Sequence, residues 1–579
     1  MTDNAQLPTT SIAERIARVR AQRSAIMALP TEEKQAAIMA FDQPVALVHA
    51  FAEQDFLLLV DEIGPDNALE IIALASDRQW EHLVDARIWL DDRLDLVETT
   101  RWIDRLCRAD AERTVSWLAR DKPELLELYL FRNINIIVRE PDLEAAAMPD
   151  EYFTFDDSFY MEIPELPPRV EGDATDDSLR QELLRDLLNR MVDQDHHLLQ
   201  RILLETIRVL PAEAEEGEYR LRNVRMAEKG FLPFEEAVGI YQAVDADSLG
   251  QTPPKPAIKN PDTHGALSVP LYPAGKIPGD NGFARALALI TDPDAYAGLQ
   301  TEFAALCNRL IVADRRSIRE PQDLADAVRK ACGYLHLGLD ALTAENGAEN
   351  PARSAALIER HSLEQIFRIG YGRCLKIKWR AEKWRRQSWY ARAGLSLTFW
   401  DEAWTGVLGG LFIKRPLFFD NYKTGQTLYR EFSQASDLRD AEAVVVQAEA
   451  VDAVLALISA DLDIVQGGSA PLTWKNLLLT CWLHHVLGID ETPTALSADQ
   501  LRNAFDRLWP DSKTADFKDE TVKAGVINWL SERTGLSPEA VSQRVGQALE
   551  DLFDELLEEY GPVRKTGLDP RFIRHFLIL

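Results

Sequence analysis

The peptide QDFLLLVDEIGPDNALEII, residues 54–72, contains on a small scale the pattern from which much of this chain is built. Phe56, Leu59 and Val60 are three or four positions apart, the spacing that places side chains on one face of a helix. Gly64 and the proline after it interrupt the pattern, and a second apolar group follows at once. The peptide therefore predicts two short helices in series.

Similar apolar groups continue towards residue 139. Phe56, Trp80 and Trp102 open successive segments of 24 and 22 residues, which form a loose internal repeat. A unit of that size cannot bury its own apolar face, but stacked neighbours cover one another. We therefore expect an all-α protein in which residues 1–139 form a superhelical, solenoid-like region of short helices.

Two family resemblances come from these and other segments. Residues 54–72 together with QWEHLVD at 79–85 resemble the superhelical N-terminal domain of MgtE-type magnesium channels, over roughly residues 30–130. That resemblance implies stacked short helices, and it implies no channel activity because the CBS modules and membrane pore have no counterpart. GFLPFEEAVGIY at 230–241 and DPRFIRHFL at 569–577 resemble an uncharacterised bacterial family of long helical proteins, which implies no activity.

The rest of the chain divides by composition. An acidic connector covers 140–177, a helical segment 178–248, a Pro/Gly-rich linker or long loop 249–282, and a larger helical C-terminal domain 283–579. The aromatic side chains of the connector favour packing over disorder. Helices are predicted over 178–210, 294–312, 321–342, 351–393, 437–460, 472–487, 498–508 and 537–559, and the apolar end of the chain is expected to dock onto the body.

Charge and cysteine content narrow the class of protein. The net charge is −30, from 94 acidic and 64 basic residues, which argues against general binding to nucleic acid or anionic membranes. No run of eighteen apolar residues exists, so no membrane span is predicted. Five well-separated cysteines without a CxxC pair fit reduced thiols and a cytoplasmic location.

Known catalytic and phosphate-binding motifs are absent from the sequence. There is no phosphate-binding GxxxxGK[ST] loop, no HExxH and no GxSxG, and Gly370-Tyr371-Gly372 lacks the third glycine of a dinucleotide loop. These absences favour a protein that is not an enzyme and that has no cofactor. An enzyme would need a pocket that gathers at least two of Asp195, His196, His336, His361, His484 and His485.

The strongest local anomaly is a basic, tryptophan-rich helix over residues 368–392. It carries nine bases against one acid, Glu382. One interpretation is an anion-binding face that uses charge and stacking; its candidate residues are Arg373, Lys376, Arg380, Lys383, Trp379 and Trp384. The alternative is a central helix whose tryptophans fill the core and whose bases pair with the acidic excess. Carboxylate partners at Lys376, Arg380 and Lys383 would favour the alternative.

Other polar residues lie on apolar stripes. Asp195 falls on the expected buried face of helix 178–210, beside His196 and His197. One interpretation of these three residues is a metal or proton-transfer site. The alternative is an aspartate that pairs with an arginine of a neighbouring helix. Cys332 with His336, and Cys481 with His485, are each half of a possible zinc site. Buried cysteines and histidines are also ordinary core residues, so no metal is predicted.

The sequence thus favours a non-catalytic, cytoplasmic helical scaffold that contacts another, unidentified protein. The alternative function is binding of an anionic ligand, a nucleotide or nucleic acid, through the basic helix 368–392. Fold class is weak evidence for function, and no feature of the sequence predicts an oligomeric state.

Overall fold

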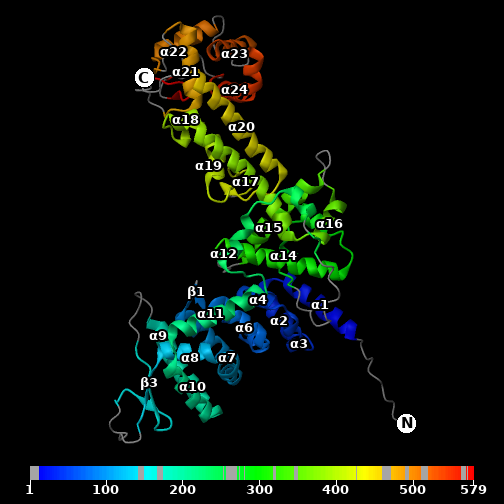
Figure 1. Cartoon of the computed structure of the whole chain (residues 1–579), viewed down its shortest axis with the longest axis vertical. Helices are drawn as coiled ribbons and strands as arrows, with labels where there is room; N and C mark the ends of the chain where they lie inside the picture. The colour runs from blue at the N-terminus through cyan, green and yellow to red at the C-terminus, as the bar shows by residue number, and fades with distance from the viewer. Residues whose placement is uncertain are drawn as a thin grey trace, which may run out of the picture. The chain divides into compact units, whose positions relative to one another are not determined.

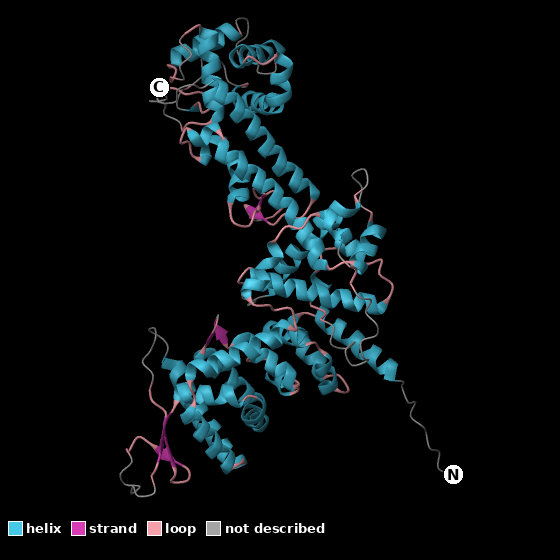
Figure 2. Cartoon of the chain, viewed as in Figure 1, coloured by secondary structure: helices cyan, strands magenta, loops and turns pink. Residues whose placement is uncertain are grey.

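The structure is a computed structural model. It describes residues 12–90, 92–140, 149–165, 174–251, 253–255, 270–272, 274–279, 281–316, 321–344, 350–425, 427–458, 471–489, 494–509, 519–561, 569 and 572–579. These residues are mostly helical, with a few short strands, so the predicted all-α class is confirmed (Figure 2). Among the described helices, none combines the length and the apolar character that crossing a membrane requires.

The chain forms two compact units. The N-terminal unit contains Met1–Gln242, Asp247–Cys332 and Thr343–Phe367, and the C-terminal unit contains Ala243–Ala246, Gly333–Leu342 and Arg368–Leu579. Helices α15 (Pro321–Thr343) and α17 (Leu363–Gln387) contribute residues to both units. The five segments proposed from composition remain a prediction.

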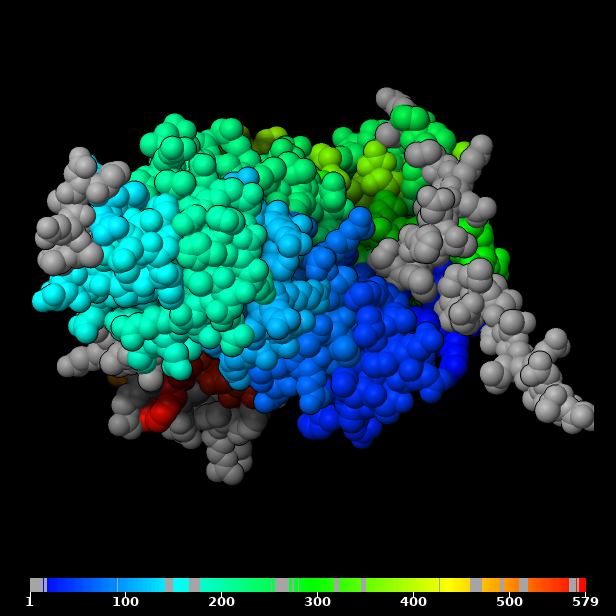
Figure 3. Space-filling model, turned by 90° about the horizontal axis from the view of Figure 1, so that it is seen from below, coloured from blue at the N-terminus to red at the C-terminus, as the bar shows by residue number. Residues whose placement is uncertain are grey.

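The first eleven helices and the strands between them belong to the N-terminal unit. They are α1 (Ile12–Ala28), α2 (Thr31–Met39), α3 (Pro44–Ala50), α4 (Glu53–Ile63), α5 (Leu69–Ala73), α6 (Asp77–Arg87), β1 (Trp89–Leu90), β2 (Arg93–Leu94), α7 (Leu96–Asp121), α8 (Pro123–Asn133), β3 (Asn135–Val138), β4 (Phe153–Thr154), β5 (Phe159–Glu162), α9 (Ala174–Gln194), α10 (His196–Arg208) and α11 (Pro211–Ala227). On one face of this unit, the dark-blue and blue helices lie beside one another, and the turquoise segment lies between them and the cyan one (Figure 3).

The remaining elements of this unit are shorter or follow the proline-rich segment. They are α12 (Phe234–Ala237), η2 (Val238–Tyr241), η3 (Ala246–Gln251, whose first residue belongs to the other unit), η5 (Ala274–Lys276), α13 (Gly282–Leu287), α14 (Pro293–Ala313) and α16 (Pro351–Arg360). The predicted helix 294–312 is confirmed by α14.

Local chemistry explains why the early helices are short. Helix α4 ends at Gly64, whose φ of 91° is a conformation that glycine adopts without steric cost. Helix α6 begins with a capping box between Ser76 and Gln79. The buried Gln79 amide also donates to the carbonyl oxygens of Val48 at 2.7 Å and Phe51 at 3.0 Å, at the end of α3. One side chain therefore caps its own helix and satisfies the end of another.

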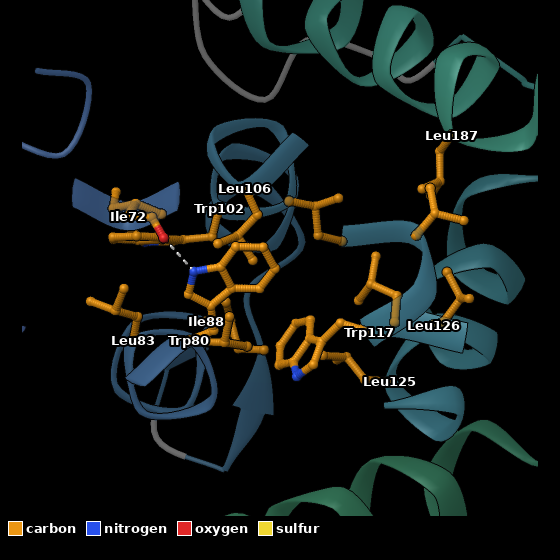
Figure 4. Close-up of a cluster of buried hydrophobic side chains, with 14 of the residues drawn as sticks. Ile72, Trp80, Leu83, Ile88, Trp102, Leu106, Trp117, Leu125, Leu126 and Leu187 are labelled. Atoms are coloured by element: carbon orange, nitrogen blue, oxygen red, sulfur yellow. Dashed lines mark hydrogen bonds between the residues drawn. The ribbon is translucent and has the colours of Figure 1, made fainter. Parts of the chain in front are cut away.

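Tryptophan side chains lie at the centre of the hydrophobic core that these early helices form (Figure 4). Phe56, Trp80 and Trp102, expected to open successive segments, are all buried. The Trp80 indole N–H donates to the carbonyl oxygen of Ile72 at 2.7 Å, and its ring meets Trp117 edge-on at 5.8 Å between centroids. The polar edge of the indole is satisfied where its ring is fully buried.

An acidic residue of the opening peptide, Asp55, is also buried. Its carboxylate accepts the backbone N–H groups of Leu271 and Tyr272 at 2.9 Å and lies 3.4 Å from the guanidinium of Arg23. Burial raises the pKa of Asp55 to about 6, against the opposing effect of these donors. This carboxylate fixes residues 271 and 272, within the segment predicted as a linker, to helix α4.

The acidic connector contributes β4 and β5 to a small antiparallel sheet, in the order β3-β5-β4, whose strand β3 lies just before the connector. Phe159 and Met161 of β5 are buried in the main core with leucines of α9. The prediction that the aromatic side chains of this segment pack rather than remain in solvent is confirmed for Phe159 and Tyr160, which are both buried. Separately, β1 pairs with β2 as a two-stranded antiparallel hairpin.

The predicted single helix over 178–210 is wrong. Helix α9 ends at Gln194 and α10 begins at His196, because Asp195 has extended backbone and caps α10. Its carboxylate accepts the backbone N–H groups of His197 at 3.0 Å and Leu198 at 3.2 Å. Asp195 is thus a capping residue at an exposed break, and not a polar group on a buried stripe.

The C-terminal unit contains the later helices and one hairpin. They are α18 (Trp389–Arg392), η6 (Leu397–Trp400), α19 (Asp401–Phe412), β6 (Phe418–Phe419), β7 (Tyr429–Arg430), α20 (Ala435–Ile458), α21 (Trp474–Leu487), α22 (Ala498–Leu508), α23 (Glu520–Thr534) and α24 (Pro538–Tyr560). Helix α20 contacts α18, α19, α23 and α24 and is the central helix of this unit (Figure 1).

Most predicted helices of the second half are present, but not the long one. The helices expected over 321–342, 437–460, 472–487, 498–508 and 537–559 correspond to α15, α20, α21, α22 and α24. The helix expected over 351–393 is instead three helices, α16, α17 and α18, which are separated at His361–Ser362 and at Ser388. Ser388 has extended backbone and caps α18, so an uninterrupted helix is impossible there.

The end of the chain packs onto the C-terminal unit, as expected from its composition. Phe576, Leu577 and Ile578 are buried. Leu496 and Ile578 form a parallel bridge, and the Leu577 N–H donates to the Thr480 hydroxyl at 2.9 Å. These contacts connect the last residues to α21 and to the segment before α22.

Candidate anion-binding site

Helix α17 has a buried side and an exposed side within the C-terminal unit. Cys374, Ile377 and Ala381, spaced by three and four positions, are buried. On the opposite side Trp379 is 48% exposed and Lys383 is exposed. The helix is therefore a surface element of this unit, not a helix surrounded by core.

Two predicted site residues near its start are ion-paired. Arg373 Nη1 lies 2.6 Å from the Asp340 carboxylate and 3.1 Å from the carbonyl oxygen of Leu337. Lys376 Nζ lies 2.8 Å from the Asp245 carboxylate. Both acids belong to the same unit.

Arg380 is paired more extensively. Its Nη2 lies 2.8 Å from Glu449 and its Nη1 lies 3.3 Å from Glu442, both on α20. The hydrogen bond with Glu449 raises the pKa of Arg380. Arg373, Lys376 and Arg380 therefore follow the alternative interpretation, in which the bases of this helix pair with acidic residues of the protein.

Trp384 faces an aromatic cluster. Its ring centroid lies 5.5 Å from that of Tyr390 and 5.5 Å from that of Trp400. Tyr390 and Trp400 are buried and meet edge-on at 5.2 Å. Trp384 therefore fastens the end of α17 to α18 and η6, whereas Trp379 is the exposed indole of the helix.

Four bases at the end of the basic segment differ from the paired ones. Lys383, Arg385, Arg386 and Arg392 are exposed, and none of them makes an ion pair with a carboxylate in the described part of the chain. The nearest acid in sequence, Glu382, instead pairs with Lys378 at 2.9 Å. These four bases, close together in the sequence, therefore form a local cluster of unpaired positive charge in a protein with a net charge of −30.

Three of these bases surround one cavity. It has a volume of about 580 Å³ and is lined by Glu382, Arg385, Arg386, Ala391 and Arg392. We call it the arginine cavity. The turn after α17 creates it, because Ser388 caps α18 while Asp452 accepts the backbone N–H groups that follow, both at 3.0 Å.

The guanidinium groups are positioned by weak local contacts. Arg385 lies over the Phe412 ring at 4.8 Å. The Nε groups of Arg386 and Arg392 each donate to a carbonyl oxygen one turn back, at 3.3 Å. The Nη groups of Arg386 and Arg392 make no hydrogen bond or ion pair within the described residues, although the charge of Arg392 opposes the rise in pKa that burial gives the Asp452 carboxyl. Such groups bind the oxygens of phosphate or carboxylate in pairs.

The sequence pattern located the basic helix but not this cavity. The bases predicted from the sequence are Arg373, Lys376, Arg380 and Lys383, whereas the cavity is lined by Arg385, Arg386 and Arg392. The available signal was three arginines within residues 385–392, ahead of a serine that can cap a helix.

The other predicted polar sites are not assembled. His196 is half-buried and lies 3.5 Å from Asp156. Cys332 is buried, and burial raises the pKa of its thiol to about 12. Where the structure describes the chain, no three His, Cys, Asp or Glu side chains gather as metal ligands would.

Comparison with known proteins adds a family and nothing further. A family model matches residues 11–579, nearly the whole chain, and its description is that of a family of unknown function. No curated protein and no solved structure matches. These comparisons therefore assign no chemistry to the site.

Proposed function

The chain belongs to the DUF6178 family of unknown function, and we propose that it is a binding protein whose C-terminal unit takes a small phosphorylated ligand in the arginine cavity. The observation that carries this proposal is a set of three arginines around one cavity, none of which makes an ion pair with a carboxylate within the described residues. Guanidinium groups keep their charge at any physiological pH and match the geometry of phosphate oxygens.

The ligand we propose is a nucleotide. Trp379, Lys383 and Arg386 follow one another at spacings of four and three residues, so they share one face of α17. Trp379 is about 10 Å along the helix axis from Arg386, within reach of a ring whose phosphates occupy the cavity. The net charge of −30 opposes a long polyanion but not a single nucleotide.

Titration of the full chain with ATP and with inorganic pyrophosphate tests the proposal. We expect saturable binding of both by calorimetry, with quenching of tryptophan fluorescence by ATP alone. Arg386→Gln with Arg392→Gln should weaken binding at least tenfold. Arg544→Gln is the matched control, because Arg544 is exposed and also lacks a carboxylate partner in the described residues. Equal affinities in these variants would exclude the arginine cavity as the site.

A second candidate function is that of a scaffold that contacts another protein, favoured by exposed apolar side chains on α10 and α11. Ile207 is 43% exposed, Leu221 52% and Val224 62%. Large exposed apolar groups often mark interaction surfaces. Leu221→Lys with Val224→Lys should then abolish recovery of a specific co-purifying protein, and Leu289→Lys, at a position 51% exposed, should not.

Two further observations support parts of these proposals. All five cysteines are free, which supports the proposed cytoplasmic location. The resemblance of residues 30–130 to the N-terminal domain of MgtE-type channels supports stacking of short helices as the basis of a scaffold. It carries no proposal of transport.

A further inference from the structure

The C-terminal unit contains a second and larger cavity, of about 1110 Å³. It lies among the first turn of α19, the β6–β7 hairpin, the start of α21, helix α24 and the end of the chain. None of the arginine-cavity residues lines it. We call it the hairpin cavity.

One wall of the hairpin cavity is apolar. Phe419, Leu428 and Tyr429 come from the hairpin and Ile573 from the end of the chain. The ring of Phe419 lies directly against Gly406, where an added Cβ would be 2.4 Å from the ring. The Tyr429 hydroxyl donates to the Gly406 carbonyl oxygen at 2.9 Å, which fixes this wall on α19.

The opposite side carries charges that satisfy one another. Lys475 Nζ lies 2.8 Å from the Asp401 carboxylate and also pairs with Glu555. Glu555 accepts from His575 at 2.9 Å, and the other ring nitrogen of His575 lies 3.0 Å from the Tyr560 hydroxyl. The hydrogen bond with His575, with the help of Lys475, lowers the pKa of Glu555 to about 2.

Asp401 is held in an unusual backbone conformation at this place. Its φ is 62° with ψ of −177°, a region rarely occupied by a residue with a side chain. Its carboxylate caps α19 at the Trp404 N–H and also accepts from the Trp474 indole at 3.3 Å. These bonds fix the charged side of the cavity in position before any ligand arrives.

Two charged side chains that line the cavity remain unpaired, and they have opposite signs. Glu402 and Arg574 are both exposed, and neither side chain makes a hydrogen bond or ion pair within the described residues. The other lining acids and Lys475 are already paired. A ligand that satisfies the free pair must offer one cationic and one anionic group, and its body must fit the apolar wall.

We propose that the hairpin cavity binds a zwitterionic ligand with an apolar body, of the class of a short hydrophobic peptide. Its ammonium group contacts Glu402 and its carboxylate contacts Arg574. The hairpin side chains cover its apolar body. A volume of about 1110 Å³ exceeds the needs of one amino acid and suits a small peptide. This site is independent of the nucleotide proposed for the arginine cavity.

The test uses trileucine as the probe, with its N-acetyl and C-terminal amide forms, titrated into the full chain by calorimetry. The unmodified protein should bind trileucine at least fivefold more tightly than either blocked form. Glu402→Gln should bind trileucine and the N-acetyl form equally, while it still distinguishes the amide. Arg574→Gln should show the reverse pattern.

Three further variants complete the test. Glu558→Gln removes an exposed, unpaired acid of α24 outside the cavity and should leave all three affinities unchanged. Gly406→Ala should displace Phe419 and weaken all three peptides alike. Arg386→Gln with Arg392→Gln should leave peptide binding intact. No binding of trileucine, or binding that ignores both terminal charges, would overturn the proposal.

Discussion

Arg430 Nε donates to Asp420 Oδ1 at 2.8 Å, and this bond closes the turn between β6 and β7. The same guanidinium donates to both carboxylate oxygens of Asp437 on α20, also at 2.8 Å. Asp420 and Asp437 are almost completely buried. One arginine therefore fixes the hairpin that carries the apolar wall of the hairpin cavity to the central helix of its unit.

Replacing Arg430 should destabilise the C-terminal unit strongly. Arg430→Met leaves two buried carboxylates without their cation, and breaking such an arrangement costs about 3 kcal/mol or more. Urea unfolding of the full chain, followed by tryptophan fluorescence, measures the loss. Arg502→Met is the matched control, because Arg502 pairs only with the exposed Asp499; its effect should stay below about 1 kcal/mol. Similar losses in the two variants would contradict this assignment.

The same cluster predicts a dependence of stability on pH. Burial alone would raise the pKa of Asp420, but hydrogen bonds from Thr424 and Arg430 outweigh it and lower the pKa to about 2. Since this pKa lies below the ordinary value of 3.8, the ionised carboxylate stabilises the folded state above about pH 4. That contribution is lost as the pH falls from about 4 towards 2.

Asp420→Asn measures this contribution. The wild type should be more stable than the variant near neutral pH, and the difference in free energy of unfolding should shrink as the pH falls below about 4. Urea midpoints at a series of pH values provide the comparison, with Asp499→Asn, at an exposed position, as the control. A difference that stays constant down to about pH 2 would show that the Asp420 charge is not the cause.

The all-α fold class was predictable from the sequence because helical periodicity is a local property. The positions at which helices end could not be predicted in the same way. Asp195 lies where the apolar spacing continues unbroken, so its role as a cap appears only in its backbone geometry. Ser388 is hidden in the same way within a run of helix-forming residues. The sheet formed by β3, β5 and β4 was also missed, since an acidic composition outweighed a short strand pattern.

The candidate site was predictable only in part, because the sequence shows where bases gather but not which acids they contact. The excess of bases in residues 368–392 is visible in the sequence, whereas their partners are not. Glu449 is 69 residues from Arg380 along the chain, and Asp245 is 131 residues from Lys376. Only the folded structure distinguishes these ion-paired cations from Arg386 and Arg392, which make no ion pair within the described residues.

A pair of glycines in the N-terminal unit should respond in opposite directions to alanine. Gly230 has a φ of 87°, and an added Cβ would lie 2.6 Å from Ala305 Cα. Gly230→Ala should therefore cost at least about 2 kcal/mol, through backbone strain and overpacking. Gly217 lies within α11 with no atom near an added Cβ, so Gly217→Ala should stabilise by about 0.5–1 kcal/mol. Urea midpoints decide both signs, and a loss of stability in Gly217→Ala would contradict the open position assigned to it.

Charge reversal at two neighbouring bases of α17 should separate folding from binding. Arg380→Glu places a third carboxylate beside Glu442 and Glu449, and we expect a loss of about 1 kcal/mol in the free energy of unfolding. Lys383 has no carboxylate partner in the described residues, so Lys383→Glu should change stability by less than about 0.5 kcal/mol. The same Lys383 variant should weaken ATP binding, because the new charge lies on the face between Trp379 and Arg386. Combining Arg380→Glu with Glu449→Arg should recover stability if the pair is the cause of the loss. Equal destabilisation by the two single variants, with ATP affinity unchanged in Lys383→Glu, would remove this face from the proposed site.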